Sequence, residues 1–333
     1  MRPGSAALLA LAVLAPSCDR TRAARKTPAS TEDSAAPAGS PAAATDARAA
    51  ATASIHCKMD PSFPSVLDVP EGSAAAEIEL RPGARDLFVV SDSDRKGAAL
   101  AYALPDGPPR PMTLPIDPRV SDDTEGLAWL SGHLYALVSI GYIERFTPDG
   151  HGGLTRDADA YVVGPPPFVA SWTTASNQPP DFEGLCLRSP PSPVDRAATR
   201  QGSSDAGARR CDGYAASRAY GWLVCLVFDA AGRLRVNPDH PRLALDVPKQ
   251  SLSDCAFGSA DGPAKGDLLV TTNIRGGSTV YEVDETTGAL AAIDVEGTIN
   301  NEAIAVDRDG RLYEIADQNA GRSPAARASC TGW

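Results

Sequence analysis

The chain has 333 residues, of which 42 are acidic and 31 are Lys or Arg, so its formal net charge at pH 7 is −11. An acidic chain without a basic stripe or an aromatic platform excludes a typical nucleic-acid-binding protein. The same balance favours cations as partners and argues against binding to anionic lipid surfaces. We therefore expect a monomer that has no nucleic-acid partner.

Residues 1–17 predict a secretory signal peptide, because they carry one positive charge and an apolar run, Ala6–Ala15, that is too short to span a bilayer. The run LAPSC resembles the lipobox of bacterial lipoproteins, whose cysteine becomes lipid-modified after cleavage. This resemblance implies a membrane anchor at Cys18 and a place in the bacterial cell envelope, periplasmic or at the surface. Ala15 and Pro16 depart from the lipobox pattern, so free secretion stays open.

Residues 18–56 form the predicted linker. Almost every residue from Asp19 to Ser54 is Ala, Pro, Ser, Thr or a scattered charge, a composition that cannot bury enough apolar surface to fold. We expect a disordered tether here, lipid-anchored or free. A single globular domain should follow over residues 57–333, a length that is ample for one closed core.

A repeated unit organises this domain. Each copy has an acidic residue, a short apolar strand, a turn and a second apolar strand, and its clearest version is NNEAIAVDRDGRLYEIADQ at Asn300–Gln318. The acidic position recurs every 48 to 71 residues, at Glu77, Glu125, Glu183, Asp254 and Glu302. Two such strands cannot bury both faces alone, so the copies must stack against one another.

The copies have room for two further strands each, as in GSTVYEVDETTGALAAIDV. Four antiparallel strands per roughly 40 to 50 residues predict an all-β fold, a β-propeller of four-stranded blades; we expect five blades, with six as the alternative. Ser189–Arg218 lacks an apolar period and predicts a surface insertion in the third copy, before its second strand GWLVCLVF. The last copy is too short, so Asp60–Val69 should supply its outer strand and close the ring.

Six cysteines follow Cys18, an even number that predicts disulfides in an exported chain, although fifteen pairings are open. The blade pattern suggests the pairs Cys57–Cys330, Cys186–Cys225 and Cys211–Cys255. The first pair joins the two ends of the ring, the second joins neighbouring strands of the third copy, and the third ties the insertion to the fourth copy. A zinc site is disfavoured, because there is no C-x-x-C and no histidine at a zinc-like spacing.

Four runs carry a family resemblance: DDTEGLAWLSGHLYALVS, DFEGLCL, GDLLVTTNIRGGSTVYEVD and NNEAIAVDRDGRLYEIADQN. They resemble the SdiA-regulated propellers of bacteria and, more distantly, the esterase-like phytase and gluconolactonase propellers. The resemblance covers Glu71 to Asn319 and implies an exported five-bladed protein with a calcium site. This chain departs from the family pattern at Glu77, which lacks a following Gly, at Asp254, which replaces Glu, and at Ala303, which replaces Gly.

The five repeated carboxylates are the candidate metal site. The first strand of each propeller blade lines the central channel, so these side chains should gather at one mouth, where like charges raise one another's pKa unless a cation joins them. Oxygen ligands without a thiolate or imidazole suit calcium best and magnesium next. A structural role, accepting backbone hydrogen bonds within and between blades, is the alternative, and direct catalysis is a third. Asp123, Asp181, Asn300 and Asn301 precede the carboxylates and could add oxygen ligands.

The loops after the second strands should emerge together as a polar, ligand-binding face. They carry Asp92, Asp94, Asn273, Arg275, Asp317 and Asn319, with Ser139 at the equivalent place in the second copy. Arg275 would hold an anionic ligand or pair with Asp254 or Asp317.

Two functions follow from these features. The first is a calcium-stabilised, non-catalytic module that binds a small molecule, glycan or protein at this face. The alternative is a calcium-dependent hydrolase of phosphoesters or lactones, with Glu125 or Glu302 as general base. No G-x-S-x-G, H-E-x-x-H or glycine-rich phosphate loop assigns catalytic residues. The predicted face is mostly acidic or neutral, whereas phosphate binding needs several cations, so binding is favoured.

Overall fold

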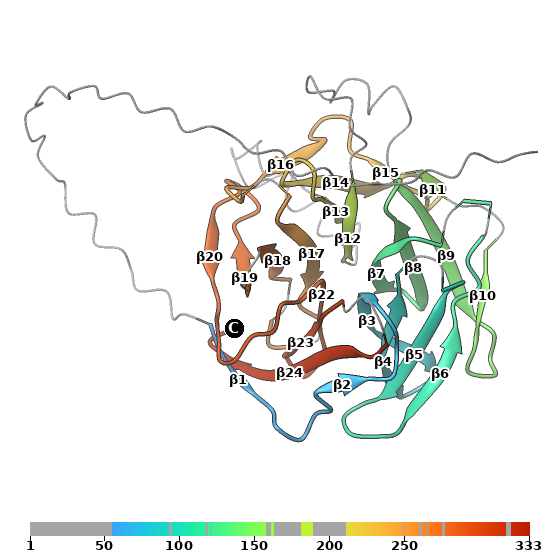
Figure 1. Ribbon diagram of the computed structural model, residues 1–333. Helices are drawn as coiled ribbons and strands as arrows, with labels where there is room; N and C mark the ends of the chain where they lie inside the picture. The colour runs from blue at the N-terminus through green and yellow to red at the C-terminus, as the bar shows by residue number, and fades with distance from the viewer. Residues whose placement is uncertain are drawn as a thin grey trace, which may run out of the picture. The chain divides into compact units, whose positions relative to one another are not determined.

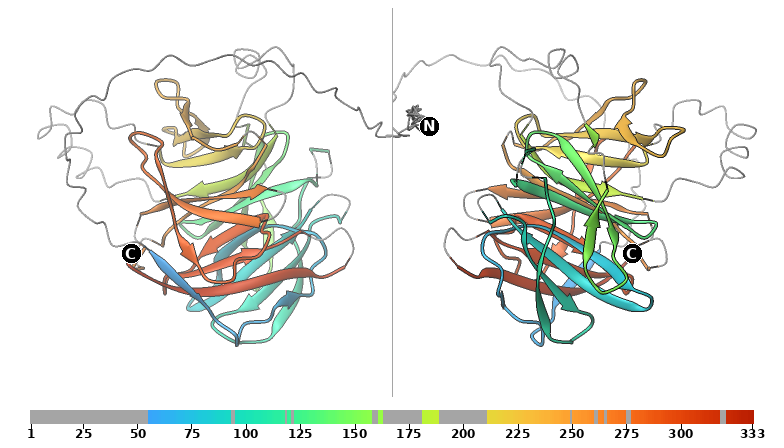
Figure 2. Two further views of the ribbon diagram at one scale, coloured as in Figure 1. Left: turned by 60° about the vertical axis from the view of Figure 1, so that its left-hand side comes forward. Right: turned by 90° about the vertical axis from the view of Figure 1, so that its right-hand side faces the viewer.

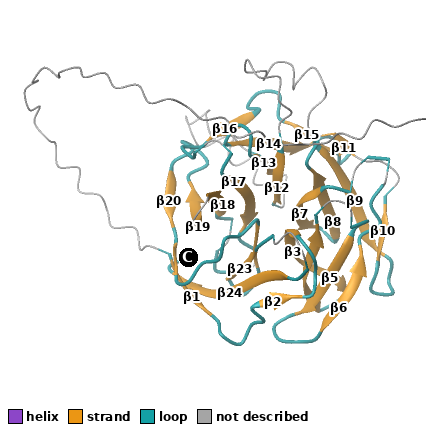
Figure 3. Ribbon diagram, in the orientation of Figure 1, coloured by secondary structure: helices purple, strands orange, loops and turns teal. Residues whose placement is uncertain are grey.

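The computed structural model describes residues 55–92, 95–117, 119–120, 122–157, 161–162, 181–188, 211–248, 250–259, 262–264, 266–274, 277–317 and 321–333. These residues belong to the compact unit Ala51–Trp333 and form 24 strands and no helix (Figure 3), so none of them lies in a helix that could cross a membrane. The predicted signal peptide, Cys18 and most of the tether lie outside the described residues, and so does most of the predicted insertion.

The strands form five sheets, the blades of a propeller, whose innermost strands β3, β7, β12, β17 and β22 surround the centre (Figure 1). Blade 1 contains β3 (Gly72–Arg81), β4 (Ala84–Ser91), β5 (Ala98–Ala103) and β6 (Pro109–Thr113). Blade 2 contains β7 (Thr124–Leu130), β8 (His133–Val138), β9 (Tyr142–Pro148), β10 (Leu154–Arg156) and β11 (Tyr161–Val162). Blade 3 contains β12 (Phe182–Leu187), β13 (Gly213–Ser217), β14 (Trp222–Phe228), β15 (Leu234–Val236) and β16 (Arg242–Ala244).

Blade 4 contains β17 (Leu252–Phe257), β18 (Leu268–Ile274), β19 (Gly277–Val283) and β20 (Leu290–Ala292). Blade 5 contains β22 (Ala303–Val306), β23 (Arg311–Ile315), β24 (Ser323–Thr331), β1 (His56–Met59) and β2 (Val66–Leu67), and β21 (Asp294–Val295) lies beside β1. The all-β, five-bladed propeller expected from the repeats is thus confirmed.

The core lies between the blades rather than inside them. In β4, Leu87 and Val89 join the apolar cluster shared with blade 5, whereas Phe88 and Val90 join the cluster shared with blade 2, and all four are fully buried. Successive side chains of a strand point to opposite faces of its sheet, so a blade buried on both faces needs an unbroken apolar run. Five such clusters, one at each junction between neighbouring blades, hold the ring together.

Blade 5 closes the ring because it combines the first strands of the domain, β1 and β2, with the last strands, β22 to β24. β1 pairs antiparallel with β24, and Cys57 lies opposite Cys330, to which it is disulfide-bonded; Figure 2 shows the blue β1 alongside the red β24. The predicted closing segment Asp60–Val69 contains only the short β2, and the longer closing strand begins earlier, at His56. Closure by an N-terminal segment and the pair Cys57–Cys330 are confirmed, whereas the prediction that Asp60–Val69 forms the outer strand is wrong.

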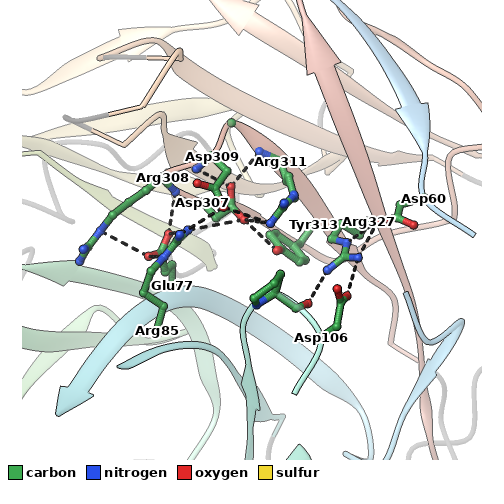
Figure 4. A network of polar contacts seen from close by, with 12 residues as sticks. Asp60, Glu77, Arg85, Asp106, Asp307, Arg308, Asp309, Arg311, Tyr313 and Arg327 are labelled. Carbon is green, nitrogen blue, oxygen red and sulfur yellow. Dashed lines mark hydrogen bonds and ion pairs between the residues drawn. The ribbon is translucent and has the colours of Figure 1, made fainter. Parts of the chain in front are cut away.

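Arg327 fastens this closure to blade 1 (Figure 4). Its side chain is 3% exposed and donates hydrogen bonds to Asp60 at 2.6 and 2.9 Å, to Asp106 at 2.8 Å and to the carbonyl of Pro105 at 2.5 Å. Its guanidinium also lies 5.1 Å from the ring centre of Phe63. One buried cation therefore joins the segment after β1 to the turn after β5.

The third blade differs from expectation, because its second strand is β13, which lies within the predicted insertion, and GWLVCLVF forms the third strand, β14. Tyr214 therefore sits between Cys186 and Cys225 in the ladder, and those two cysteines cannot bond. The disulfides are Cys186–Cys255, which joins the inner strands of blades 3 and 4, and Cys211–Cys225. The predicted pairs Cys186–Cys225 and Cys211–Cys255 are wrong.

Candidate functional site

Four of the inner strands carry one position that interrupts the ladder near the start, and in blade 5 the equivalent residue, Glu302, comes just before β22. In β7 the pairing passes from Thr124 to Gly126 and leaves Glu125 as a bulge, and the same shift leaves Glu183 out of the ladder of β12. The equivalent positions of the five blades are Ser73, Glu125, Glu183, Ser253 and Glu302, which we call the inner ring. A bulge re-aims its side chain, and here it turns Glu125 and Glu183 toward one mouth of the channel, where Glu302 joins them from the residue before β22.

Glu77 does not belong to the inner ring. The strand β3 is ten residues long, and Glu77 lies four residues beyond Ser73, toward the other mouth. There its carboxylate accepts hydrogen bonds from Arg85 at 2.6 Å and from the backbone of Arg308 at 2.7 Å (Figure 4). The acidic position of the first copy was therefore aligned to the wrong end of its strand.

Asp254 lies one residue beyond its inner-ring position and so faces another way. It is 2% exposed and accepts hydrogen bonds from the backbone of Cys255 at 2.7 Å and of Ile304, in the next blade, at 2.8 Å. This is the geometry of the structural alternative, a carboxylate that joins neighbouring blades. The structure brings together three of the five predicted carboxylates, Glu125, Glu183 and Glu302.

The glycines that follow Glu125 and Glu183 permit the close approach of the inner strands. A Cβ on Gly126 would lie 2.3 Å from the backbone nitrogen of Leu185, and one on Gly184 would lie 2.3 Å from a carboxylate oxygen of Asp254. The Glu-Gly pairs of the sequence thus combine a side chain aimed at the mouth with a residue small enough for the neighbouring strand.

A second ring is formed by residues at the ends of the second strands or just after them. It consists of Asp92, Ser139, Arg218, Asn273 and Asp317, which we call the outer ring. Of the residues predicted for the ligand-binding face, Asp92, Asn273 and Asp317 occupy equivalent places in their blades, whereas Asp94, Arg275 and Asn319 lie outside the described residues. The sequence does not single out Arg218, because β13 lies within the predicted insertion; the only local signal is the short run YAASR ahead of the Gly turn.

The two rings exchange hydrogen bonds. Arg218 donates from Nη1 to Glu183 at 3.0 Å, the amide of Asn273 donates to Glu302, and the hydroxyl of Ser139 donates to Asp123. Asp123 precedes Glu125 and adds a further carboxylate. We call the group of Asp92, Asp123, Glu125, Glu183, Arg218 and Glu302 the acidic mouth.

Glu125 lies in the most negative part of the acidic mouth. Its carboxyl group is enclosed by surrounding protein, although part of the side chain stays accessible, and no described residue donates a hydrogen bond to it. Burial raises its pKa well above the usual range, and the carboxylates of Glu183, Asp92, Asp123 and Glu302 raise it further. Carboxylate oxygens of Asp92, Asp123 and Glu125 lie within 4.8 Å of one another.

The other half of the acidic mouth is partly compensated by Arg218. Burial raises the pKa of Glu183 to about 8 in spite of the opposing Arg218 guanidinium. Burial also raises the pKa of Glu302, against Arg218 and the hydrogen bond from Asn273. Carboxyl groups of this kind take up protons or a cation near neutral pH, and perturbed pKa values in a concave site are typical of functional residues.

The opposite half of the channel is a cavity of about 580 Å³. Small apolar residues of the inner strands and the disulfide Cys186–Cys255 form its walls, and its rim includes Trp129, Arg188 and Arg308. Both arginines are engaged there, Arg188 by Glu285 at 2.5 Å and Arg308 by Glu79 at 2.9 Å. Negative charge without a nearby cation therefore gathers at the acidic mouth rather than around this cavity.

Comparisons with known proteins assign no family to the chain. No family model and no curated protein matches the chain. A glutaminyl cyclase of Myxococcus xanthus is 14% identical over 84% of this chain and 99% of its own, with a TM-score of 0.47. YCF48 bound to D1 peptide is 10% identical over 78% of this chain and 65% of its own, with a TM-score of 0.33. A functionally unknown protein from Desulfotomaculum acetoxidans is 10% identical over 69% of this chain and 59% of its own, with a TM-score of 0.35. What the chain is shown to be is a five-bladed β-propeller with three disulfides.

Proposed function

We propose that the acidic mouth binds a calcium ion and that the protein is a non-catalytic binding module of the bacterial cell envelope. The observation that carries this proposal is the cluster of Asp92, Asp123 and Glu125, whose oxygens lie within 4.8 Å of one another. Calcium–oxygen distances are roughly 2.3 to 2.6 Å, so oxygens at this separation fit around one ion. The enclosed Glu125 carboxyl, which lacks a hydrogen-bond donor among the described residues, fits a ligand in need of a cation.

The ligand chemistry favours calcium over softer metals. The three residues of the cluster offer only carboxylate oxygens, and all six described cysteines are engaged in disulfides. Calcium accepts roughly six to eight oxygens in irregular geometry, whereas magnesium demands a near-octahedral set. Glu183 and Glu302 lie close enough to raise the pKa of Glu125 and supply further negative charge.

The compartment, the anchor, the family and the partner that the sequence predicts also belong to the proposal. Three disulfides are typical of proteins from an oxidising compartment. An anchor at Cys18, membership of the SdiA-regulated family and a small molecule, glycan or protein as the partner all belong to the same proposal. The propeller then acts as a monomer that presents its acidic mouth to that partner.

A calcium-dependent hydrolase is the second candidate, and the pKa of Glu183 favours it. A carboxyl with a pKa of about 8 is a proton donor at neutral pH, as a general acid requires. A bound calcium ion would polarise a phosphoryl or lactone oxygen. Glu125 or Glu302 would serve as the general base.

Calorimetry of the purified full chain tests the calcium site. After EDTA treatment and dialysis, calcium is titrated into the wild type, Glu125→Gln and Glu77→Gln. We expect binding heat and a melting temperature that rises with the logarithm of free calcium in the wild type. Glu125→Gln should lose both, and Glu77→Gln should keep both, because Glu77 lies at the other mouth. Equal loss in the two variants, or no heat in the wild type, rejects the site.

Hydrolysis assays separate the two candidates. p-Nitrophenyl phosphate and γ-butyrolactone are offered to the calcium-loaded protein. We expect no turnover above that of calcium alone. Turnover that disappears in Glu125→Gln would replace the binding function with the hydrolase.

A further inference from the structure

The acidic mouth has one cation whose hydrogen-bonding capacity is only partly used. Arg218 bonds Glu183 through Nη1, and its Nε and Nη2 groups have no partner among the described residues. Its side chain is 40% exposed, so these N–H groups are accessible to a ligand. Arg218 also lowers the pKa of Glu302, which places the guanidinium within reach of carboxylates from blades 3 and 5.

Hydrogen-bond acceptors far outnumber donors around Arg218. Glu183 and Glu302 together offer four carboxylate oxygens, while the amide of Asn273 is engaged with Glu302. The hydroxyl of Ser139 is engaged with Asp123. A ligand that fits this site must therefore bring several donors of its own and accept the hydrogen bonds that Arg218 has left.

The charge balance excludes strongly charged ligands. Five carboxylates and one guanidinium form the acidic mouth, so a calcium ion leaves the ionised site negative and an anionic ligand is repelled. An organic ammonium competes with calcium for the oxygens of Asp92, Asp123 and Glu125, and its single charge is the weaker competitor. A neutral ligand rich in hydroxyl groups meets both conditions.

We propose that the acidic mouth binds a neutral carbohydrate through a pair of adjacent hydroxyl groups. The hydroxyl oxygens complete the coordination offered by Asp92, Asp123 and Glu125, and their protons are donated to Glu183 and Glu302. Arg218 donates to a further sugar oxygen. This inference rests on the proposed calcium site and adds the class of ligand to it.

Saturation-transfer NMR tests the ligand class on the full chain. The probes are the methyl glycosides of mannose, galactose, glucose and fucose, with glucuronate and glucosamine as charged analogues. We expect transfer to at least one neutral glycoside in calcium, loss of that transfer in EDTA, and weaker transfer to both charged analogues. Stronger binding of a charged analogue, or no neutral glycoside bound by the calcium-loaded protein, overturns the inference.

A pair of surface variants tests the position of the sugar. Arg218→Gln should weaken the bound glycoside about fivefold, since it removes the guanidinium that donates to a sugar oxygen. Arg233→Gln is the matched control, because Arg233 is 63% exposed just before the outer strand β15 of blade 3 and should leave affinity unchanged. Equal effects of the two substitutions contradict the position. Calcium calorimetry on the same samples separates the two proposals: calcium binding without glycoside binding refutes only the inference, and no calcium binding refutes the proposed function.

Discussion

The stability of the calcium-free protein should fall as the pH rises from 5 to 8, and Glu183 gives the magnitude. Its pKa is about 8 in the folded protein against 4.5 for a free side chain. The folded state then binds more protons than the unfolded state between these values, so raising the pH favours unfolding. At about 1.4 kcal/mol per pKa unit, this carboxyl alone removes roughly 2 to 3 kcal/mol of the free energy of unfolding between pH 5 and pH 7.

Other groups do not reverse this trend in that pH window. The raised pKa values of Glu125 and Glu302 act in the same direction. Carboxyl groups with lowered pKa values, such as Asp60 at about 2, stabilise the fold above the unfolded pKa and have finished titrating by pH 5. The fall should therefore be visible in the whole protein.

Urea unfolding at pH 5, 6, 7 and 8 measures the effect in EDTA and in calcium. We expect a fall in EDTA, a smaller fall in Glu183→Gln, and little fall in calcium, because the cation binds the deprotonated carboxylates. A free energy of unfolding that stays level or rises between pH 5 and 8 in EDTA refutes the reasoning. Equal slopes for the wild type and Glu183→Gln refute the assignment to this residue.

Two further predictions concern ring closure. Arg327→Met should lower the free energy of unfolding by about 3 kcal/mol, because it leaves the carboxylates of Asp60 and Asp106 without their cation. Urea unfolding measures this change. A loss below about 1 kcal/mol contradicts the role of Arg327 in joining blade 5 to blade 1. Replacing both Cys57 and Cys330 by Ser should cost more than replacing both Cys211 and Cys225. The disulfide Cys57–Cys330 closes a loop of 273 residues and Cys211–Cys225 one of 14, so chain entropy limits their contributions to the free energy of unfolding to about 5.6 and 3 kcal/mol. A larger loss from the Cys211 and Cys225 replacement contradicts this account.

The fold was predictable because its signals are short-range and repeated. Apolar runs with Asp/Gly turns recur in every blade, and a last copy too short for four strands indicates closure by an earlier segment. The pair Cys57–Cys330 follows from that closure, since both cysteines must lie on neighbouring strands of one blade. The equivalent places of Asp92, Asn273 and Asp317 in their blades follow from the same repeat.

The site was less predictable because it depends on single-residue register. A bulge selects Glu125 and Glu183, and nothing in the sequence shows that Glu77 lies too far along a longer strand. Asp254 is off by one position, which in a strand turns the side chain to another face.

Arg218 could not be placed from the sequence because the strand before it, β13, has no local strand signal. The strand before it reads GYAAS, which lacks large apolar residues and resembles the loop composition around it. A run of small residues forms a strand there because β12 and β14 flank it on both sides, a tertiary effect that local pattern does not report.

The shared blade also orders the events of biosynthesis. Cys57 emerges from the ribosome first among the described cysteines and Cys330 last, with four other cysteines between them. The growing chain thus presents an early thiol whose native partner has not yet been synthesised. The pairs Cys186–Cys255 and Cys211–Cys225 can form during that interval, but any disulfide that Cys57 makes then is mispaired and must be exchanged before β24 and β1 close the ring.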